Sequence, residues 1–238
     1  MSKFNLNSNG YTIGFLAVLV AVVGVALASI SSSLDPIIKA NEKLDNRTKV
    51  LRSIIQDPDV KFTADFVNET FETKISPHLI DFSGEIVKDE IPLDYNFRNE
   101  TRKPAEERLL PLYIFEDGDK KVYVLEMIGL GLWDEINGFL SLEDNKRIIQ
   151  GVAFDHKGET PGLGAEIVRD WFTSQFEGKT LIDKDGNFVF RVYKAGKYDG
   201  SDEAVDGISG ATITADGVDA MIKTTVERYK NFLNKPSV

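Results

Sequence analysis

Near its C-terminus the chain reads Asp206-Gly207-Ile208-Ser209-Gly210-Ala211-Thr212-Ile213-Thr214, and residues 215–233 follow with apolar side chains at helical spacing. The two glycines of this run can take positive φ angles and allow close approach of other groups to the backbone. The pattern therefore predicts a tight turn that leads into the last helix of the chain.

The start of a helix attracts anions, because its first N–H groups lack intrahelical partners and its dipole end is positive. A phosphate group is one anion that this turn could hold. Ser209, Thr212 and Thr214 add hydroxyl groups that could cap the helix, bind phosphate oxygens or be esterified. The simpler interpretation is a glycine turn and N-cap that only begin a helix, and spacing alone leaves both open.

Two more glycine clusters lie upstream, Gly129-Leu130-Gly131-Leu132-Trp133-Asp134 and His156-Lys157-Gly158-Glu159-Thr160-Pro161-Gly162-Leu163-Gly164. Backbone bent in this way, with a carboxylate and a hydroxyl close by, could wrap a planar ring and present N–H groups to its polar edge. The alternative for the second cluster is an ordinary loop that enters a helix.

Composition excludes several classes of function. The 238 residues carry a net charge of -10 and contain no cysteine. An acidic chain argues against nucleic acid as a partner, and the lack of thiols removes disulfides and thiolate metal sites. With only His78 and His156, neither a histidine metal site nor a nucleophilic triad on Ser209 is predicted, so we assign no catalytic and no metal-binding residue.

The N-terminal region predicts one transmembrane helix. No charged residue occurs between Phe4 and Leu34, and residues 11–30 are almost wholly apolar, which matches the roughly 20 residues needed to cross a bilayer. A cleaved signal peptide, with Ala26-Leu27-Ala28 as its small residues, is the alternative. We expect an N-terminal arm at 1–10, a membrane helix at 11–33, a helical stalk at 34–60 and a single domain at 61–238.

The rest of the chain predicts an α+β domain, with a twisted, mostly antiparallel sheet and helices packed on it. Strand composition occurs at 78–87, 110–115, 121–128, 136–142, 147–154 and 188–193. Helical patterns occur at 34–56, 63–75, 165–176 and 215–233. Asp117-Gly118 predicts a hairpin turn, and the polar segment 88–104 predicts a long surface loop.

The pattern Asp-x-x-Ser-Gly-Ala-Thr-x-Thr at 206–214 resembles the flavinylation motif of the FMN-binding domain family, and Glu-Thr-Pro-Gly-Leu-Gly at 159–164 resembles its second signature. The resemblance implies that a separate flavin transferase, with FAD as donor, esterifies FMN through its phosphate to Thr214. The other residues that it implies at the cofactor are Ser209, Gly210, Ala211, Thr212, Glu159, Thr160, Gly162 and Leu163.

Three aromatic residues carry separate expectations. Trp133 and Trp171 are expected in the core, with stacking on the flavin as the alternative for Trp133, which we therefore keep among the cofactor-binding candidates. His156 is expected to lie in a loop and bond to backbone groups, with contact to the flavin as the alternative.

Within that family, the N-terminal span, the Gly-Leu-Trp-Asp turn at 131–134 and the two signatures together resemble the C-type flavin subunits of sodium-translocating NADH:quinone oxidoreductases. This implies a relay subunit in a bacterial inner-membrane complex, with an iron–sulfur/FAD subunit and a second flavin subunit as partners. Electrons from NADH would pass through FMN towards ubiquinone, coupled to Na⁺ export. The glycine runs lack the Gly-x-Gly-x-x-Gly pattern of a dinucleotide fold, so no NADH site is expected on this chain.

Two alternatives remain open from the sequence. One is the G-type subunit of an Rnf ferredoxin:NAD⁺ oxidoreductase, which shares both signatures. The other is a membrane-tethered sensory or structural module that carries no flavin.

Membrane orientation has two conflicting signals. Lys3 precedes the span, whereas Lys39, Lys43, Arg47, Lys49 and Arg52 follow it, and this charge count places the C-terminal domain in the cytoplasm. The resemblance implies the periplasmic side, which we favour because the N-terminal arm is short.

Overall fold

The structure is a computed structural model that describes residues 9–92 and 95–235. Contacts divide the chain into two compact units, residues 1–45 and 46–238, and each is described by itself. Residues 1–8 of the expected N-terminal arm, with Lys3, lie outside the described residues, and Asn9 and Gly10 already belong to the first helix.

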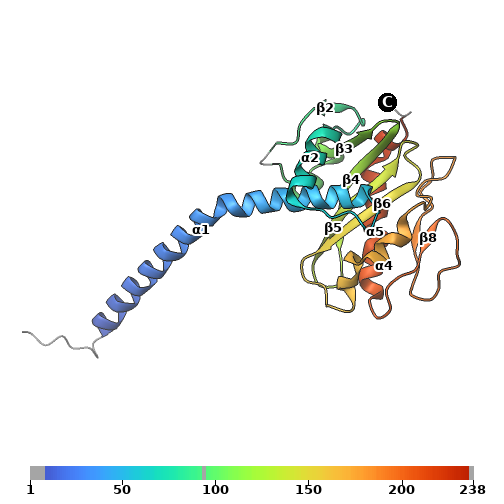
Figure 1. Ribbon diagram of the computed structural model, residues 1–238. Helices are drawn as coiled ribbons and strands as arrows, with labels where there is room; N and C mark the ends of the chain where they lie inside the picture. The colour runs from blue at the N-terminus through green and yellow to red at the C-terminus, as the bar shows by residue number, and fades with distance from the viewer. Residues whose placement is uncertain (1–8, 93–94, 236–238) are drawn as a thin grey trace, which may run out of the picture. The chain divides into compact units, whose positions relative to one another are not determined.

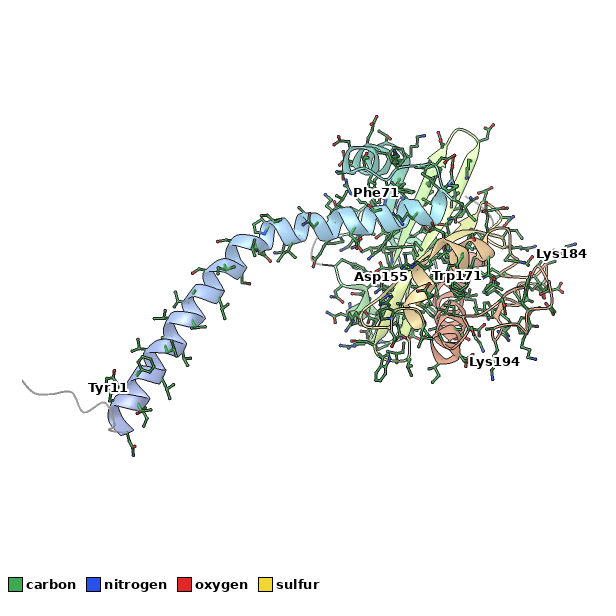
Figure 2. All side chains as sticks on the ribbon, turned by 60° about the horizontal axis from the view of Figure 1, so that its bottom comes forward. Tyr11, Phe71, Asp155, Trp171, Lys184 and Lys194 are labelled. Carbon is green, nitrogen blue, oxygen red and sulfur yellow. The ribbon has the colours of Figure 1, made fainter. Side chains whose placement is uncertain are left out.

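The first unit consists of the exposed part of α1 (Asn9–Ile54), drawn in blue in Figure 1. It contains an 18-residue stretch with a mean hydropathy of 2.8, and no residue of this stretch is buried. The side chains project outward around the helix (Figure 2). Ser29 Oγ donates to the Val25 carbonyl and Ser33 Oγ to the Ser29 carbonyl, both at 2.8 Å. These polar groups are satisfied inside the helix, as a membrane requires. Among the described residues, this is the one helix long and apolar enough to cross a membrane.

A six-stranded antiparallel sheet forms the centre of the second unit (Figure 1). Its order is β2-β1-β3-β4-β5-β6, so the last four strands are neighbours in sequence and in space. The strands are β1 (Ile75–Ile80), β2 (Ile86–Lys88), β3 (Leu110–Asp117), β4 (Lys120–Leu130), β5 (Glu135–Glu143) and β6 (Ile149–His156). The predicted α+β fold is confirmed, and the predicted hairpin turn at Asp117-Gly118 joins β3 to β4.

One face of the sheet is covered by α5 (Thr212–Leu233), which runs along it (Figure 1). Alternate residues of β4, among them Tyr123, Leu125 and Met127, are buried in the same core as the apolar side of α5. The Tyr229 hydroxyl donates to the Pro111 carbonyl at 2.7 Å and so ties the helix to β3. The sheet thus fixes the axis of the helix that follows the glycine-rich turn at 206–211.

The other face is covered by residues 46–54 at the end of α1 and by α2 (Ala64–Lys74). Ser53 and Ser141 share a buried hydrogen bond of 2.6 Å, and Gln150 Nε2 donates to the Ile54 carbonyl at 3.2 Å. The rings of Phe71 and Tyr113 meet edge to face at 6.2 Å. The end of the long helix is therefore an integral part of this domain's core.

Residues 165–176 do not form the single helix that their sequence predicts. They form η2 (Gly164–Val168), α4 (Asp170–Thr173) and η3 (Ser174–Phe176), and the backbone is extended at Arg169 between the first two. The three buried side chains are Ile167, Phe172 and Phe176. A straight helix would point Ile167 about 140° away from Phe172, because each residue turns the helix by about 100°. The break lets all three reach one core.

The predicted strand at 188–193 is also largely wrong. Only β7 (Arg191–Val192) forms, and it pairs in parallel with β8 (Ala204–Val205). The Val192 N–H donates instead to the Asp219 carboxylate on α5, at 2.8 Å. A side chain from another element thus replaces a sheet partner.

Two further segments differ from expectation. The strand predicted at 78–87 is divided by a turn in which Asp81 accepts hydrogen bonds from the Ser83 hydroxyl and the Glu85 N–H. The loop predicted at 88–104 contains α3 (Phe97–Thr101), which Asn96 caps and whose Phe97 is buried, followed by η1 (Ala105–Glu107). In both segments, hydrogen bonds from the backbone to a local side chain determine where the turn or helix forms.

The turn between β1 and β2 packs closely against the backbone of α5, and this contact can be tested by mutation. Gly84 has a φ of 78°, and a Cβ there would lie 2.5 Å from the Phe232 backbone nitrogen. Gly118 has a φ of 61° in the turn between β3 and β4, with nothing within 4 Å. We expect Gly118→Ala to lower the free energy of unfolding by about 1 kcal/mol from backbone strain. Gly84→Ala should cost about 3 kcal/mol, because overpacking adds to the strain. Urea unfolding of both variants checks this, and equal losses would contradict the close contact.

Candidate functional site

The site begins at the N-terminus of α5. The turn before the helix closes with the Ala211 N–H donating to the Ile208 carbonyl at 3.0 Å, and Gly210 has a φ of 76°. Ala211 occupies the N-cap position, and no side chain caps the helix there. The N–H groups of the first helical turn are therefore available to an outside acceptor.

The helix starts three residues earlier than its apolar pattern predicts. Thr212, not Ala215, is its first residue, so Thr214 lies within the first turn and not before it. Ser209, Gly210 and Thr212 are partly or fully exposed on the turn, whereas Ala211 and Thr214 are buried. Of the three candidate hydroxyls, those of Ser209 and Thr212 therefore lie at the surface and that of Thr214 lies in the interior.

Thr214 is held by a carboxylate from a distant part of the chain. Its Oγ1 donates a hydrogen bond of 2.7 Å to Oε2 of Glu159, which lies 55 residues earlier. Thr214 is 1% exposed and Glu159 is 4% exposed, so the pair is shielded from water. The structure therefore brings the two sequence signatures into direct contact.

The second oxygen of Glu159 is also occupied. Oε1 accepts a hydrogen bond of 2.9 Å from the Trp133 N–H. Burial acts to raise the pKa of the Glu159 carboxyl, but hydrogen bonds from the Trp133 N–H, the Thr214 hydroxyl, and the Asp134 and Leu132 N–H groups outweigh it, so the pKa is lowered. Glu159 is therefore a buried anion at neutral pH.

Two glycines make room for this anion. A Cβ at Gly131 would lie 2.4 Å from Glu159 Oε1, and a Cβ at Gly164 would lie 2.3 Å from Oε2 and 2.6 Å from Thr214 Oγ1. Any larger residue at either position would displace the carboxylate. Close packing against Glu159 thus explains why glycine occupies positions 131 and 164 of the two upstream clusters.

Trp133 lies at the surface of the site, so its expected place in the core is wrong. It is 70% exposed, and its indole N–H donates to the Thr160 hydroxyl at 3.1 Å. Together with the Glu159 bond, this contact joins the loop at 131–134 to the loop at 159–164. Trp171 is half-exposed on α4 and is likewise not a core residue.

Exposed apolar side chains surround the pair. They come from three segments: Leu130, Leu132 and Trp133 from the end of β4 and the β4–β5 connection, Leu163 from the 159–164 loop, and Ile213 from the first turn of α5. Leu163 also packs towards Gly210, where a Cβ would meet its Cδ2 at 2.8 Å. An apolar surface beside an uncapped helix terminus suits a ligand with a flat ring and an anionic tail.

Other sequence expectations fall outside this cluster. His156 is the last residue of β6 and not a loop residue; within the described chain, its buried Nδ1 has no hydrogen-bond partner. Among the described residues, no group of three or more His, Cys, Asp and Glu side chains could hold a metal ion.

One residue of the site was missed from the sequence. Gly217 lies inside α5, and a Cβ there would lie 2.3 Å from the Leu130 carbonyl oxygen. It lets the end of β4 lie directly against the helix start. Its signal was a glycine inside a helical pattern, which often marks a close contact.

Comparison with known families agrees with this geometry. Residues 131–227 match the FMN-binding domain family, and this span includes Gly131, Glu159 and Thr214. The C subunit of the Na(+)-translocating NADH-quinone reductase of Vibrio vulnificus (strain YJ016) is 30% identical over 224 residues, covering 87% of this chain and 86% of that protein. The corresponding protein of Neisseria meningitidis serogroup A is 30% identical over 239 residues, covering 91% and 89%.

Solved structures give the same result. The crystal structure of the same reductase subunit from Parabacteroides distasonis is similar to this chain with a TM-score of 0.75 and 32% identity, covering 85% of this chain and 98% of that one. Shewanella oneidensis NqrC is similar with a TM-score of 0.66 and 26% identity, covering 79% and 98%. The fold is thus common to these proteins.

The lowered pKa of Glu159 predicts a pH-dependent contribution to stability. A carboxyl whose pKa is lower in the folded state stabilises the fold above its unfolded pKa of about 4.3, and this contribution is lost as the pH falls through the folded-state pKa. We expect Glu159→Gln to lower the free energy of unfolding at pH 7, and its difference from wild type to shrink as the pH is lowered below the unfolded pKa towards the folded-state pKa. Chemical unfolding across this range is the measurement, with the exposed Glu203→Gln as control. A loss that does not change with pH would show that Glu159 is not a buried anion.

Proposed function

Because the chain belongs to the family of C subunits of the Na(+)-translocating NADH-quinone reductase, we propose that it carries FMN esterified to Thr214 and relays electrons within that complex. The observation that carries the proposal is the buried hydrogen bond between Thr214 and Glu159 at the start of α5. This bond distinguishes the Thr214 hydroxyl from the other hydroxyls of residues 206–214, because it places the Glu159 carboxylate as a proton acceptor beside it.

The start of α5 suits the phosphate end of the cofactor. A threonine phosphodiester keeps one negative charge, and the uncapped N–H groups of the first helical turn can stabilise it. Thr212 and Ser209, which are exposed on the same turn, can donate hydroxyl groups to the remaining phosphate oxygens. The helix start therefore fits the group, whereas the Glu159 carboxylate, 2.7 Å from Thr214 Oγ1, must move away or take up a proton once the phosphate is attached.

Glu159 orients the reacting oxygen in the unmodified protein. Its carboxylate accepts the Thr214 proton in a hydrogen bond, so it is placed to act as the base for that oxygen. Esterification removes this proton, so the hydrogen bond between the two residues belongs to the unmodified protein alone. Thr214 is 1% exposed, so its side chain or the 159–164 loop must move before a transferase can reach it.

The apolar rim suits the ring of the cofactor. Leu132, Trp133, Leu163 and Ile213 present exposed hydrophobic surface beside the helix start. When bound, FMN supplies a ring that accepts and releases one or two electrons. The chain's residues supply position and charge: the loops at 131–134 and 159–164 fix the rim, and covalent attachment keeps the cofactor at a high local concentration.

The remaining parts of the proposal concern the assembly. Residues 11–33 form a single-pass anchor in the bacterial inner membrane and residues 34–45 a stalk. Residues 46–60, which the sequence predicts as part of the stalk, belong with residues 61–238 to the FMN-binding domain, which lies on the periplasmic side. A subunit with iron–sulfur and FAD groups delivers electrons from NADH, and a second flavin subunit takes them towards ubiquinone, with Na⁺ export coupled to the transfer. The apolar helix that begins at Asn9 and the family membership support the anchor.

Co-expression with a flavin transferase tests the attachment site. We expect wild-type protein to retain yellow-green flavin fluorescence in a denaturing gel, and Thr214→Ala to lose it completely because the ester oxygen is gone. Thr212→Ala removes a hydroxyl that we place at the phosphate and should lower the fluorescence only in part, whereas Ser174→Ala removes an exposed hydroxyl outside the site and should keep all of it. Fluorescence retained in Thr214→Ala would place the ester elsewhere, and none in wild type would favour a module without flavin.

The positive φ of Gly210 gives a second test. Valine at a φ of 76° should cost about 1–2 kcal/mol of strain, and its side chain would also displace Leu163. We expect Gly210→Val to lose at least nine-tenths of the bound flavin. Gly178→Val introduces the same strain at a φ of 73°, with nothing within 4 Å, and should keep its flavin. Equal flavin content in the two variants, at equal unfolding temperature, would contradict a role for Gly210 at the cofactor.

A further inference from the structure

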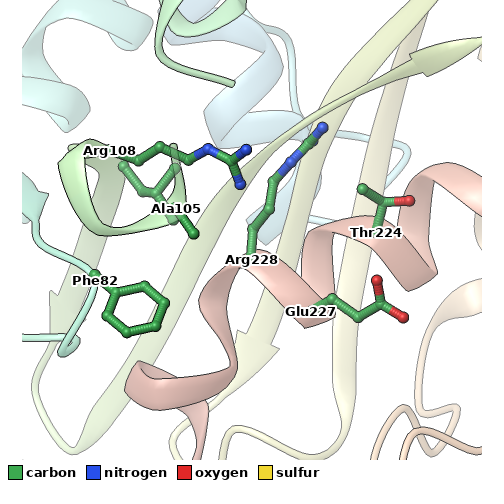
Figure 3. A pocket seen from close by; sticks show the side chains of 7 residues that line it. Phe82, Ala105, Arg108, Thr224, Glu227 and Arg228 are labelled. Atoms are coloured by element: carbon green, nitrogen blue, oxygen red, sulfur yellow. The ribbon is translucent and has the colours of Figure 1, made fainter. Parts of the chain in front are cut away.

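A hollow lies on the same helix, far from Thr214. It has a volume of about 250 Å³ and is formed by α5, the segment that leads from η1 into β3, and the turn after β1 (Figure 3). Arg228 and Thr224 line it from α5, Arg108 from the segment before β3, and Phe82 from the turn. Arg228 is 14 residues along the helix from Thr214, which is about 21 Å at 1.5 Å per residue.

Both arginines are anchored by backbone carbonyls and not by acids. Arg108 Nε donates to the Lys103 carbonyl at 2.8 Å, and Arg228 Nη1 donates to the Ile128 carbonyl at 3.5 Å. The first bond holds Arg108 in place, and the second is a long, weak contact that orients Arg228. Most of the guanidinium N–H groups remain for another acceptor. Figure 3 shows both guanidinium groups on the same side of the hollow.

The two positive charges are not neutralised inside the described chain. Among residues 9–92 and 95–235, neither arginine forms an ion pair with a carboxylate. Glu227 lines the hollow, but its carboxylate points away from the two guanidinium groups (Figure 3). Burial lowers the pKa of Arg228, and the positive charge of Arg108 lowers it further. Two like charges held together without an acid, in a protein of net charge -10, leave a place for an anion.

We propose that this hollow is a second anion site, which binds a phosphate group through Arg108 and Arg228. Two guanidinium groups, one from α5 and one from the segment before β3, offer donors from two elements, which suits a tetrahedral group with several oxygens better than a planar carboxylate. Phe82 is 47% exposed at the same hollow and can contact the organic part of a phosphate ester. The phosphate can be free or belong to a lipid headgroup.

Calorimetric titration of the flavinylated full-length protein with inorganic phosphate tests the site. In this form the start of α5 is occupied, and ionic strength is kept constant with chloride because salt screens such contacts. We expect saturable binding in wild type, with a Kd at least tenfold higher in Arg108→Gln and in Arg228→Gln. Arg228→Lys keeps the charge but loses the planar fork, and should also bind more weakly. Arg169→Gln alters an exposed arginine on the surface and should bind as wild type does.

Two results would overturn the proposal: no saturable binding beyond the chloride control, or the same Kd in wild type and in both glutamine variants at unchanged unfolding temperatures. The source of the phosphate is then read from protein in nanodiscs. Weaker binding of inorganic phosphate in net-neutral phosphatidylcholine nanodiscs than in a phosphate-free detergent identifies a lipid headgroup as the competing ligand. Equal binding in both identifies a free phosphate.

Discussion

In the unmodified protein, the hydrogen bond from the Thr214 hydroxyl to the Glu159 carboxylate is the interaction on which the site depends. It joins the first turn of α5 to the loop at 159–164, and the Trp133 N–H joins the same carboxylate to the loop between β4 and β5. Three segments far apart in sequence therefore meet at one buried anion. Removing that anion would leave two loops and a helix start without their common partner.

The sheet gives this cluster its position. α5 packs along the sheet through the core that includes Leu125 and Met127, and the Tyr229 hydroxyl fixes its far half to β3. At the near end, Gly217 lets the Leu130 carbonyl lie directly against the helix. The helix thus carries an uncapped terminus with an interior hydroxyl and, about 21 Å further on, Arg228, which lines a hollow together with Arg108 of the segment before β3.

Much of the fold could be predicted because it follows from local patterns. Strand composition along β3 to β6, the Asp117-Gly118 turn and the apolar spacing of α5 are visible in the sequence. The break at Arg169 was not, because it depends on Ile167, Phe172 and Phe176 sharing one core. At the site, the sequence indicated both signatures and Trp133. It did not indicate that Thr214 is buried, that Glu159 holds it, or that Trp133 is exposed, since these depend on contacts across 26 to 55 residues.

The most direct test is peptide mass spectrometry of the mature protein, isolated from the membranes of its own host. If Thr214 is the anchor of the cofactor, the proteolytic peptide that contains it carries the mass of one FMN less one water, and fragmentation places that mass on Thr214. The same peptide at its unmodified mass, in protein that is otherwise assembled in its complex, would contradict the role of this hydroxyl.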